Sequence, residues 1–511
     1  MRPAWRPWAA LSLVGAAVFA VPARVATPTP PLPVTPVLSM RRIPGLVGLA
    51  VATSTLDDGL DAALGNTQWE KSPSGACLVV QTGTDTLYSH NPALALLPAS
   101  NLKLLTATAA LDKLAADDRL TTAVDSDGPP AAGTVNGNLY PVGGGDPLLD
   151  SQAYADTQPY SAEPYDDLAK LAAQVRAAGV TAVSGSVVGD ESRYDTQRTV
   201  ASWAPSYLSD DEVGPLSALM VSDGFITPPP PPTTTTTMPP ATTPTTMPTP
   251  TTTPKTTPTT TPKTTPTTTP HLVAAAQPAQ AAAEAFTAAL GAAGVTVAGP
   301  PAVGTTPVAA THLTSLQSPP LPQVLGVILR RSDNTGAELV TKELGHQAGG
   351  AGTTAAGVSA IEADLQADGL ATTGLTMVDG SGLSRDDRAT CQLLLAALDR
   401  GGPNGALGQD LPVAAKSGTL VSRFGGTPAA GRLRAKTGSL DGVSSLSGFV
   451  TPASSSSSAG ALGAQGVAFS LITNAIPSDS AGEALTDRIG LLLAQFPEMP
   501  PLSQLGPQGR S

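Results

Sequence analysis

The sequence predicts an α+β protein in which helices pack on the faces of an antiparallel sheet. Five strands are expected, two early and three late, at 76–82, 86–89, 434–438, 444–450 and 467–472. A helix at 99–114 follows the early pair, and an amphipathic helix at 484–496 follows the late three. Runs of strands followed by helices, without regular alternation, are typical of this class.

The elements follow from the spacing of apolar residues. In 76–82 (ACLVVQT) a short apolar run predicts a buried strand. In 99–114, Leu102, Leu105 and Ala109 recur at intervals of three and four, which places them on one helical face. Between the two blocks, helices are expected at 165–178, 279–293 and 332–344, and a strand at 185–189.

The N-terminus has the pattern of an export signal. Arg2 and Arg6 precede an apolar run from residue 8 to about 23, which predicts a signal peptide or anchor over 1–26. A Pro/Thr-rich tether is expected over 27–55. We therefore expect an exported protein, either released after cleavage or held by an uncleaved anchor.

Composition excludes several kinds of partner. The chain of 511 residues is long enough for two to four domains, with 41% apolar residues and a net charge of −12. Nucleic acids and anionic membranes both require basic surfaces, so we expect neither to be bound through charge. The only membrane association expected is through an N-terminal anchor. Residues 228–270 are almost entirely Pro and Thr and are expected to be disordered.

Two cysteines, Cys77 and Cys391, leave two interpretations open. In an exported chain an even number of cysteines is consistent with one disulfide. Both also lie in apolar surroundings, which favours two buried free thiols equally.

The first motif is Ser100–Asn101–Leu102–Lys103, in which helical spacing brings Ser100 and Lys103 together. A serine hydroxyl needs a base, and a lysine amine serves only when it is neutral. Lowering its pKa by about 3 units costs roughly 4 kcal/mol, which burial and a second cation can supply. The simpler interpretation is a capping serine with a solvated lysine.

The second motif is Ser332–Asp333–Asn334. Ser332 could relay a proton to a leaving amine, and Asn334 could hold a substrate amide and orient Lys103. The simpler interpretation is a helix cap, because all three residue types are favoured there.

The third motif is Lys436–Thr437–Gly438. It lies at the end of the strand predicted at 434–438, and Ser439 follows it. A cation beside a hydroxyl suits a carboxylate ligand, and the glycine allows a substrate backbone to approach. Lys436 could also be the cation that lowers the pKa of Lys103. Lys416–Ser417–Gly418 is a decoy of similar pattern.

The three motifs in this order are shared by penicillin-binding proteins and class A β-lactamases. The chain resembles the class C low-molecular-mass penicillin-binding proteins, the D-alanyl-D-alanine carboxypeptidase/endopeptidase family. Further segments match that family: GNLYPVGGGDPLL at 137–149, GDES at 189–192, DGSGLSR at 379–385, GTLxxR at 418–423 and AKTGSLDG at 435–442.

The resemblance implies a β-lactamase/penicillin-binding (transpeptidase-like) fold. The peptidase domain would comprise 56–121 and 312–498, with inserted domains at 122–311 that contain the 228–270 tract. It implies action on peptidoglycan stem peptides through an acyl-enzyme, with β-lactams as inhibitors, and a location in the cell envelope or outside the cell.

The resemblance also implies a role for each motif residue. Ser100 would be acylated, Lys103 would be its base, and Ser332 and Asn334 would complete the proton network. Lys436 and Thr437, beside Gly438, would bind the terminal carboxylate of the substrate. The backbone N–H groups of Ser100 and Ser439 would form the oxyanion hole.

Two other functions share part of this pattern. A β-lactamase needs a deacylating Glu-x-x-Leu-Asn segment, which does not follow Asn334. A β-lactam or wall-binding sensor would be acylated without turnover, and turnover of a peptide would distinguish it from an enzyme. The histidines lack H-E-x-x-H spacing and no G-x-G-x-x-G loop occurs, so neither a metal nor a cofactor is implied.

Overall fold

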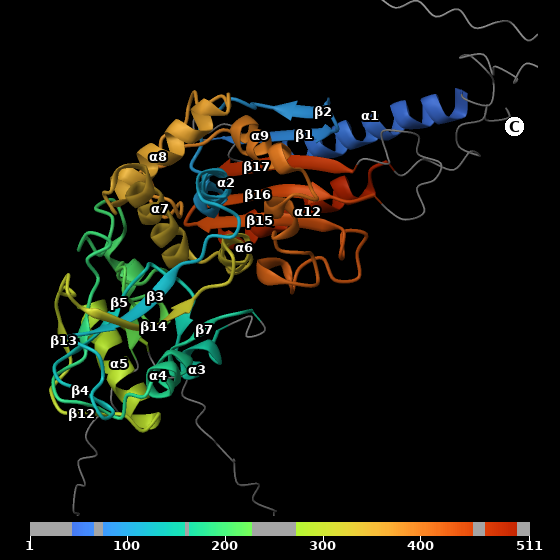
Figure 1. Cartoon of the computed structure of the whole chain (residues 1–511). Coiled ribbons are helices and arrows are strands. Elements are labelled where there is room, and N and C mark those ends of the chain that lie inside the picture. The colour runs from blue at the N-terminus through green and yellow to red at the C-terminus, as the bar shows by residue number, and fades with distance from the viewer. Residues whose placement is uncertain (1–42, 66–74, 159–162, 227–271, 453–465, 498–511) are drawn as a thin grey trace, which may run out of the picture.

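The computed structural model describes residues 43–65, 75–158, 163–226, 272–452 and 466–497 (Figure 1). The predicted signal peptide or anchor at 1–26 and the Pro/Thr tract at 228–270 therefore lie outside the described residues. Within the described ranges, no helix combines the length and hydrophobicity needed to cross a membrane.

A five-stranded antiparallel sheet forms the centre of the larger domain (Figure 1). Its order is β15-β16-β17-β1-β2, so the early strands lie at one edge and the late strands at the other. The strands are β1 (Ala76–Thr82), β2 (Asp85–His90), β15 (Leu433–Leu440), β16 (Val443–Val450) and β17 (Val467–Asn474). This confirms the predicted α+β class.

The sheet separates two hydrophobic cores, because successive side chains of a strand point to opposite faces. In β1, Cys77 and Val79 belong to one core, whereas Leu78 and Val80 belong to the other. One face is covered by α2 (Lys103–Lys113) and α9 (Cys391–Gly401), and the opposite face by α1 (Ile43–Gly65) and α12 (Asp479–Gln495). Every residue of β16 is buried, which explains its nearly continuous run of apolar and small residues.

The core that contains α2 extends into a helical half (Figure 1). It adds α6 (Leu321–Arg331), α7 (Asn334–Gly349) and α8 (Thr354–Ala367). Of these three helices, only α7 was predicted from the sequence, because the second motif, Ser332–Asp333–Asn334, consists of residue types that begin helices.

A smaller domain lies between the halves of the larger one in sequence and has its own core (Figure 1). It contains the sheet β14-β3-β5, formed by β3 (Thr121–Ser126), β5 (Leu139–Val142) and β14 (Thr311–Gln317), and the helices α4 (Leu168–Ala177) and α5 (Pro278–Ala292). Because β14 pairs with β3 along its length, the inserted region extends to residue 317 and does not end at 311 as expected.

The remaining elements are short and lie within these parts or connect them. They include η2 (Ala99–Leu102), β4 (Thr134–Val135), β6 (Leu149–Asp150), α3 (Gln152–Ala155), β7 (Asp166–Asp167), β8 (Ala182–Val183), β9 (Val188–Gly189), η3 (Pro205–Leu208), η4 (Ser222–Gly224), β10 (Phe225–Ile226), β11 (Val273–Ala274), β12 (Thr296–Val297), β13 (Ala302–Val303), α10 (Ala406–Gln409) and η5 (Gly418–Leu420). Strands β10 and β11 pair antiparallel, so the described residues that precede and follow the Pro/Thr segment lie side by side.

The N-terminal tether is shorter than predicted. Residues 43–55 were assigned to it, but they form the first half of α1. Leu56, Leu60 and Leu64 recur every four residues and are buried in the same core as α12. This apolar stripe anchors the second half of α1, and the helix continues back into the residues assigned to the tether, where Ala52 is buried in the same core.

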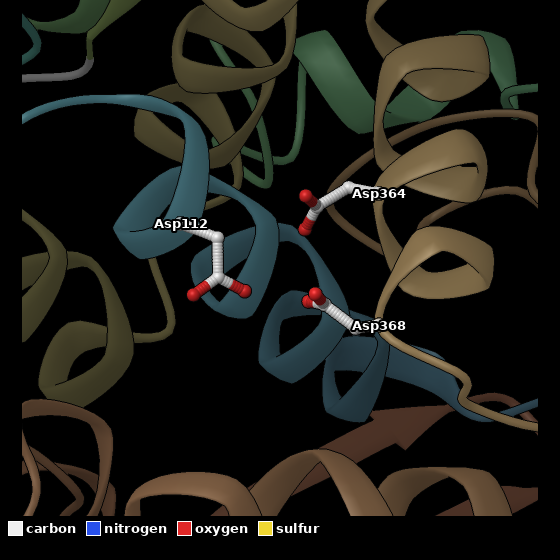
Figure 2. A group of neighbouring side chains, drawn as sticks. All are labelled: Asp112, Asp364 and Asp368. Carbon is white, nitrogen blue, oxygen red and sulfur yellow. The ribbon is translucent and has the colours of Figure 1, made fainter. Parts of the chain in front are cut away.

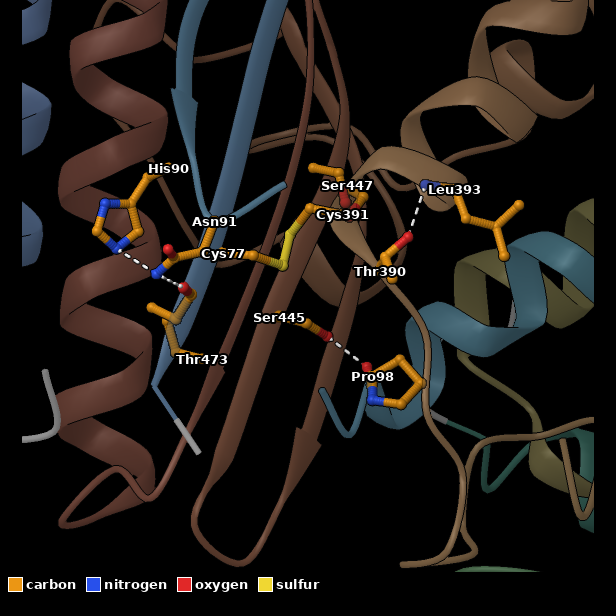
Figure 3. The surroundings of a disulfide bond; sticks show 12 residues. Cys77, His90, Asn91, Pro98, Thr390, Cys391, Leu393, Ser445, Ser447 and Thr473 are labelled. Atoms are coloured by element: carbon orange, nitrogen blue, oxygen red, sulfur yellow. Dashed lines mark hydrogen bonds between the residues drawn. A yellow bond between two sulfur atoms is a disulfide. The ribbon is translucent and has the colours of Figure 1, made fainter. Parts of the chain in front are cut away.

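Cys77 and Cys391 form a disulfide between the start of β1 and the start of α9 (Figure 3). Their Cα atoms are 5.9 Å apart and both residues are fully buried. Of the two interpretations left open by the sequence, the disulfide is therefore correct. It fixes a helix of one core to the strand that separates the two cores.

Replacing both cysteines by serine is expected to lower the free energy of unfolding by about 2–5 kcal/mol, because the unfolded chain loses a covalent constraint. Urea unfolding of the oxidised parent and the double variant measures this difference. A reductant should destabilise the parent and leave the double variant unchanged. Equal free energies of unfolding for the parent and the double variant would show that the disulfide does not stabilise the fold.

Candidate active site

The first motif forms a tight turn that leads into α2. Ser100 lies in the 3-10 turn η2, and Lys103 is the first residue of the helix. The residue before the serine, Ala99, has φ 48°, a left-handed conformation that is unfavourable for alanine. The turn brings the Lys103 Nζ atom to 3.0 Å from the Ser100 Oγ atom. The predicted pairing of hydroxyl and amine is therefore present.

Lys103 is buried, with an exposed fraction of 1%. Besides Ser100, its amine donates to the Asn334 Oδ1 atom at 2.5 Å and to the Ser381 carbonyl at 2.7 Å. Burial lowers its pKa to about 8, against the opposing charge of nearby carboxylates, of which Asp333 has the largest effect. A lysine with this pKa is partly neutral in mildly alkaline solution and can accept a proton.

The second motif joins two helices. Ser332 ends α6 in a left-handed conformation with φ 59°, and Asp333 caps α7 by accepting a hydrogen bond from the Gly336 N–H group at 2.8 Å. The capping interpretation is therefore correct for Asp333. Its neighbours Ser332 and Asn334 instead contact Lys436 and Lys103. The Asn334 amide also donates to the Glu212 carbonyl of the inserted region at 2.7 Å.

The third motif lies on β15. The Lys436 amine is fully buried and donates to the Ser332 Oγ atom at 2.8 Å and to the Thr437 carbonyl at 2.6 Å. Burial, reinforced by the charge of Lys103, lowers the pKa of Lys436 well below its usual value. The sequence predicted that burial and a second cation together would lower the pKa of Lys103; burial is the main cause of that shift, and the repulsion between the two lysines lowers the pKa of Lys436. The Thr437 hydroxyl donates to the Thr419 hydroxyl at 2.8 Å.

Gly438 allows β15 to lie against the turn that carries Ser100. A Cβ atom at this position would come within 2.2 Å of the Ser445 Oγ atom and 3.1 Å of the Ser100 backbone nitrogen. The Ser445 hydroxyl donates to the Pro98 carbonyl at 2.8 Å, which ties β16 to the same turn. Ser439, the next residue, is exposed.

Hydrogen bonds therefore connect the three motifs. Lys103 joins the first motif to the second through Ser100 and Asn334, and Lys436 joins the third to the second through Ser332. The decoy Lys416 is exposed, whereas Lys436 is buried. Sequence reasoning gave no role to the Ser381 carbonyl or to Thr419, although both lie in segments quoted for the family resemblance.

One group of carboxylates within the described ranges is close enough to hold a metal ion: Asp112, Asp364 and Asp368 (Figure 2). Arg400 already pairs with Asp112 and Asp368, and Lys113 pairs with Asp364 at 3.0 Å. Asp112 is also nine residues from Lys103 on α2, or about 13 Å along a helix. These carboxylates form ion pairs between α2, α8 and α9, outside the site.

Comparison with known proteins finds relatives along most of the chain. Residues 56–496 match the D-Ala-D-Ala carboxypeptidase 3 (S13) family. A D-alanyl-D-alanine carboxypeptidase from Actinomadura sp. (strain R39) is 31% identical over 506 residues, which cover 91% of this chain and 89% of the relative.

The solved structure of penicillin binding protein 4 from Haemophilus influenzae has the same fold. Its TM-score is 0.63 at 21% identity, over 85% of this chain and 98% of that one. The same protein complexed with a β-lactam gives a TM-score of 0.58 at 20% identity, over the same shares of both chains. These likenesses confirm the fold expected from the three motifs.

Gly438→Ala is expected to slow the covalent reaction of the protein with benzylpenicillin by about 100-fold, because the added methyl group displaces the turn that carries Ser100. Rapid-quench mass spectrometry measures this rate. Gly401→Ala is the control, since nothing lies within 4 Å of a Cβ atom there. A folded Gly438→Ala protein that reacts at the parental rate would contradict the close contact between β15 and the turn that carries Ser100.

Proposed function

The chain belongs to the D-Ala-D-Ala carboxypeptidase 3 (S13) family and is a serine peptidase, and we propose that Ser100 is its nucleophile and Lys103 its general base. The observation that supports these roles most strongly is the position of the buried Lys103 amine, 3.0 Å from the Ser100 hydroxyl. The substrate would be the D-alanyl-D-alanine end, or a crosslink, of a peptidoglycan stem peptide.

In the acylation step, the neutral Lys103 amine accepts the proton of Ser100 as the hydroxyl oxygen attacks the scissile carbonyl carbon. Asn334 and the Ser381 carbonyl hold the amine in place, since each binds one of its hydrogens. The C–N bond then breaks, and Ser332, whose hydroxyl Lys436 contacts, relays the proton held by Lys103 to the leaving amine of D-alanine, which leaves Lys103 neutral again. The products are an ester on Ser100 and a free D-alanine.

The third motif would bind the substrate. The Lys436 ammonium and the Thr437 hydroxyl would hold the terminal carboxylate, and the arriving negative charge would favour the protonated form of Lys436. The N–H groups of Ser100 and Ser439 would stabilise the oxyanion of the tetrahedral intermediate. Gly438 leaves room for the substrate backbone beside the strand.

Water then hydrolyses the ester: Lys103 accepts a proton from the attacking water and returns it to the Ser100 oxygen as the ester bond breaks. The same acyl-enzyme serves carboxypeptidase and endopeptidase action, because the two differ only in the amine that leaves. A β-lactam would acylate Ser100 and act as an inhibitor, in keeping with the β-lactam complex of the Haemophilus influenzae protein. The N-terminal pattern and the substrate together support an exported enzyme in the cell envelope or outside the cell.

Treatment with benzylpenicillin is expected to add one drug mass to the parent protein and none to Ser100→Ala or Lys103→Ala, because the first lacks the nucleophile and the second lacks the base. Intact mass spectrometry measures the adduct. Lys416→Ala, which changes the exposed decoy, should keep the adduct. An adduct on Ser100→Ala would assign the nucleophile elsewhere.

The rate constant of acylation is expected to rise with pH through about 8, because Lys103 accepts a proton only in its neutral form and its pKa is about 8. Stopped-flow measurements from about pH 6 to about pH 10 test this. An apparent pKa near the ordinary lysine value of about 10.4 would argue against a base buried in this way.

A further inference from the structure

The carboxyl group of Glu338 has no part in the proposed mechanism, although it is fully buried beside the site. It lies on α7 four residues after Asn334, so both side chains leave the same face of the helix. Burial, with the nearby charge of Asp379, raises its pKa to about 8. Because a buried carboxyl is costly unless hydrogen bonds compensate it, its contacts indicate what it does.

The Glu338 Oε1 atom accepts two backbone hydrogen bonds, from the N–H groups of Gly380 at 2.9 Å and Ser381 at 2.8 Å. The carbonyls of the same two residues are bound by α2. The Gly380 carbonyl accepts from the Thr106 hydroxyl at 2.7 Å, and the Ser381 carbonyl accepts from the Lys103 amine at 2.7 Å. Residues 380–381 thus bridge α7 and α2, with Glu338 on one side and the base on the other.

This bridge has little room to move. A Cβ atom on Gly380 would lie 1.7 Å from the Thr341 Oγ1 atom of α7. A Cβ atom on Gly382 would lie 2.1 Å from the carbonyl oxygen of Ala99, the residue before the nucleophile. The segment is therefore wedged between α7 and the turn of Ser100, and a shift at one end is transmitted to the other.

We propose that Glu338 is a positioning residue for acylation: it holds the 380–381 backbone so that the Ser381 carbonyl fixes the Lys103 amine beside Ser100. This inference rests on the proposed roles of Ser100 and Lys103. The contribution of Glu338 is one acceptor oxygen, since its Oε2 atom has no hydrogen-bond partner among the described residues. An amide, which keeps one acceptor oxygen, should therefore replace the carboxyl.

The test compares Glu338→Ala with Glu338→Gln in the reaction with benzylpenicillin. The amplitude of the adduct counts competent sites, and the rate constant is taken per competent site, so partial misfolding lowers only the amplitude. Glu338→Ala is expected to react about 100-fold more slowly than the parent, because the amine loses its fixed position. Glu338→Gln is expected to stay within about threefold of the parent, because both N–H groups keep their acceptor.

Glu343→Ala is the matched control. Glu343 is a buried carboxylate on the same helix, but it pairs with Arg193 of the inserted region at 2.6 Å. Its loss should lower the melting temperature and leave the rate constant per competent site within about threefold of the parent. If Glu338→Ala does not fold, Glu338→Asp replaces it, with an expected loss of about tenfold because its acceptor is one bond shorter.

Two results would overturn the inference: a parental rate constant in the Ala or Asp variant, or a Gln variant as slow as Ala. Both leave the proposed function intact, because adduct formation at Ser100 in the parent tests that function separately from Glu338. A parent that forms no adduct would instead contradict the proposed function itself.

Discussion

The burial of the Lys103 amine is the constraint on which the site depends. An ammonium group with 1% exposure is costly unless oxygen acceptors surround it, and three do. Each acceptor comes from a different part of the chain: the turn before α2, the start of α7 and the 379–384 loop. The amine can be buried only when these parts are correctly assembled, so folding of the chain and formation of the proposed base are the same event.

The inserted region takes part in this assembly, although it lies outside the central sheet. Its Glu212 carbonyl orients the amide of Asn334, and its Trp203 indole donates to Asp379 at 2.8 Å, at the start of the 379–384 loop. Further along α7, Arg193 and Tyr194 both bind Glu343. The smaller domain thus contacts α7 at both ends, but only its contacts with Asn334 and Asp379 reach the site. These two contacts explain how a segment absent from the sheet contributes to the geometry of the site.

The sequence was informative wherever local pattern decides structure. Strand 76–82 was predicted with the bounds it has, because a short apolar run between polar residues has few alternatives. Ser100, Lys103, Asn334, Ser332 and Lys436 are brought into contact within one site, as predicted, because they lie in the turn before α2, at the start of α2, at the junction of α6 and α7, and on β15. Helix α8 (TAAGVSAIEADLQA) was missed although Val358, Ile361 and Leu365 recur at intervals of three and four, because small residues make up most of the rest of the segment. The roles of Ser381 and Glu338 depend on contacts between distant segments, which no local pattern reveals.

The disulfide has a topological consequence. Cys77 and Cys391 are 314 residues apart, and the whole inserted region, with its Pro/Thr segment, lies between them. A protease that cut the backbone between Ile226 and Leu272 would produce two polypeptides, one carrying the first motif and the other carrying the second and third. The bond between β1 and α9 would still join them covalently. A nicked enzyme would therefore keep its two halves together until a reductant released them.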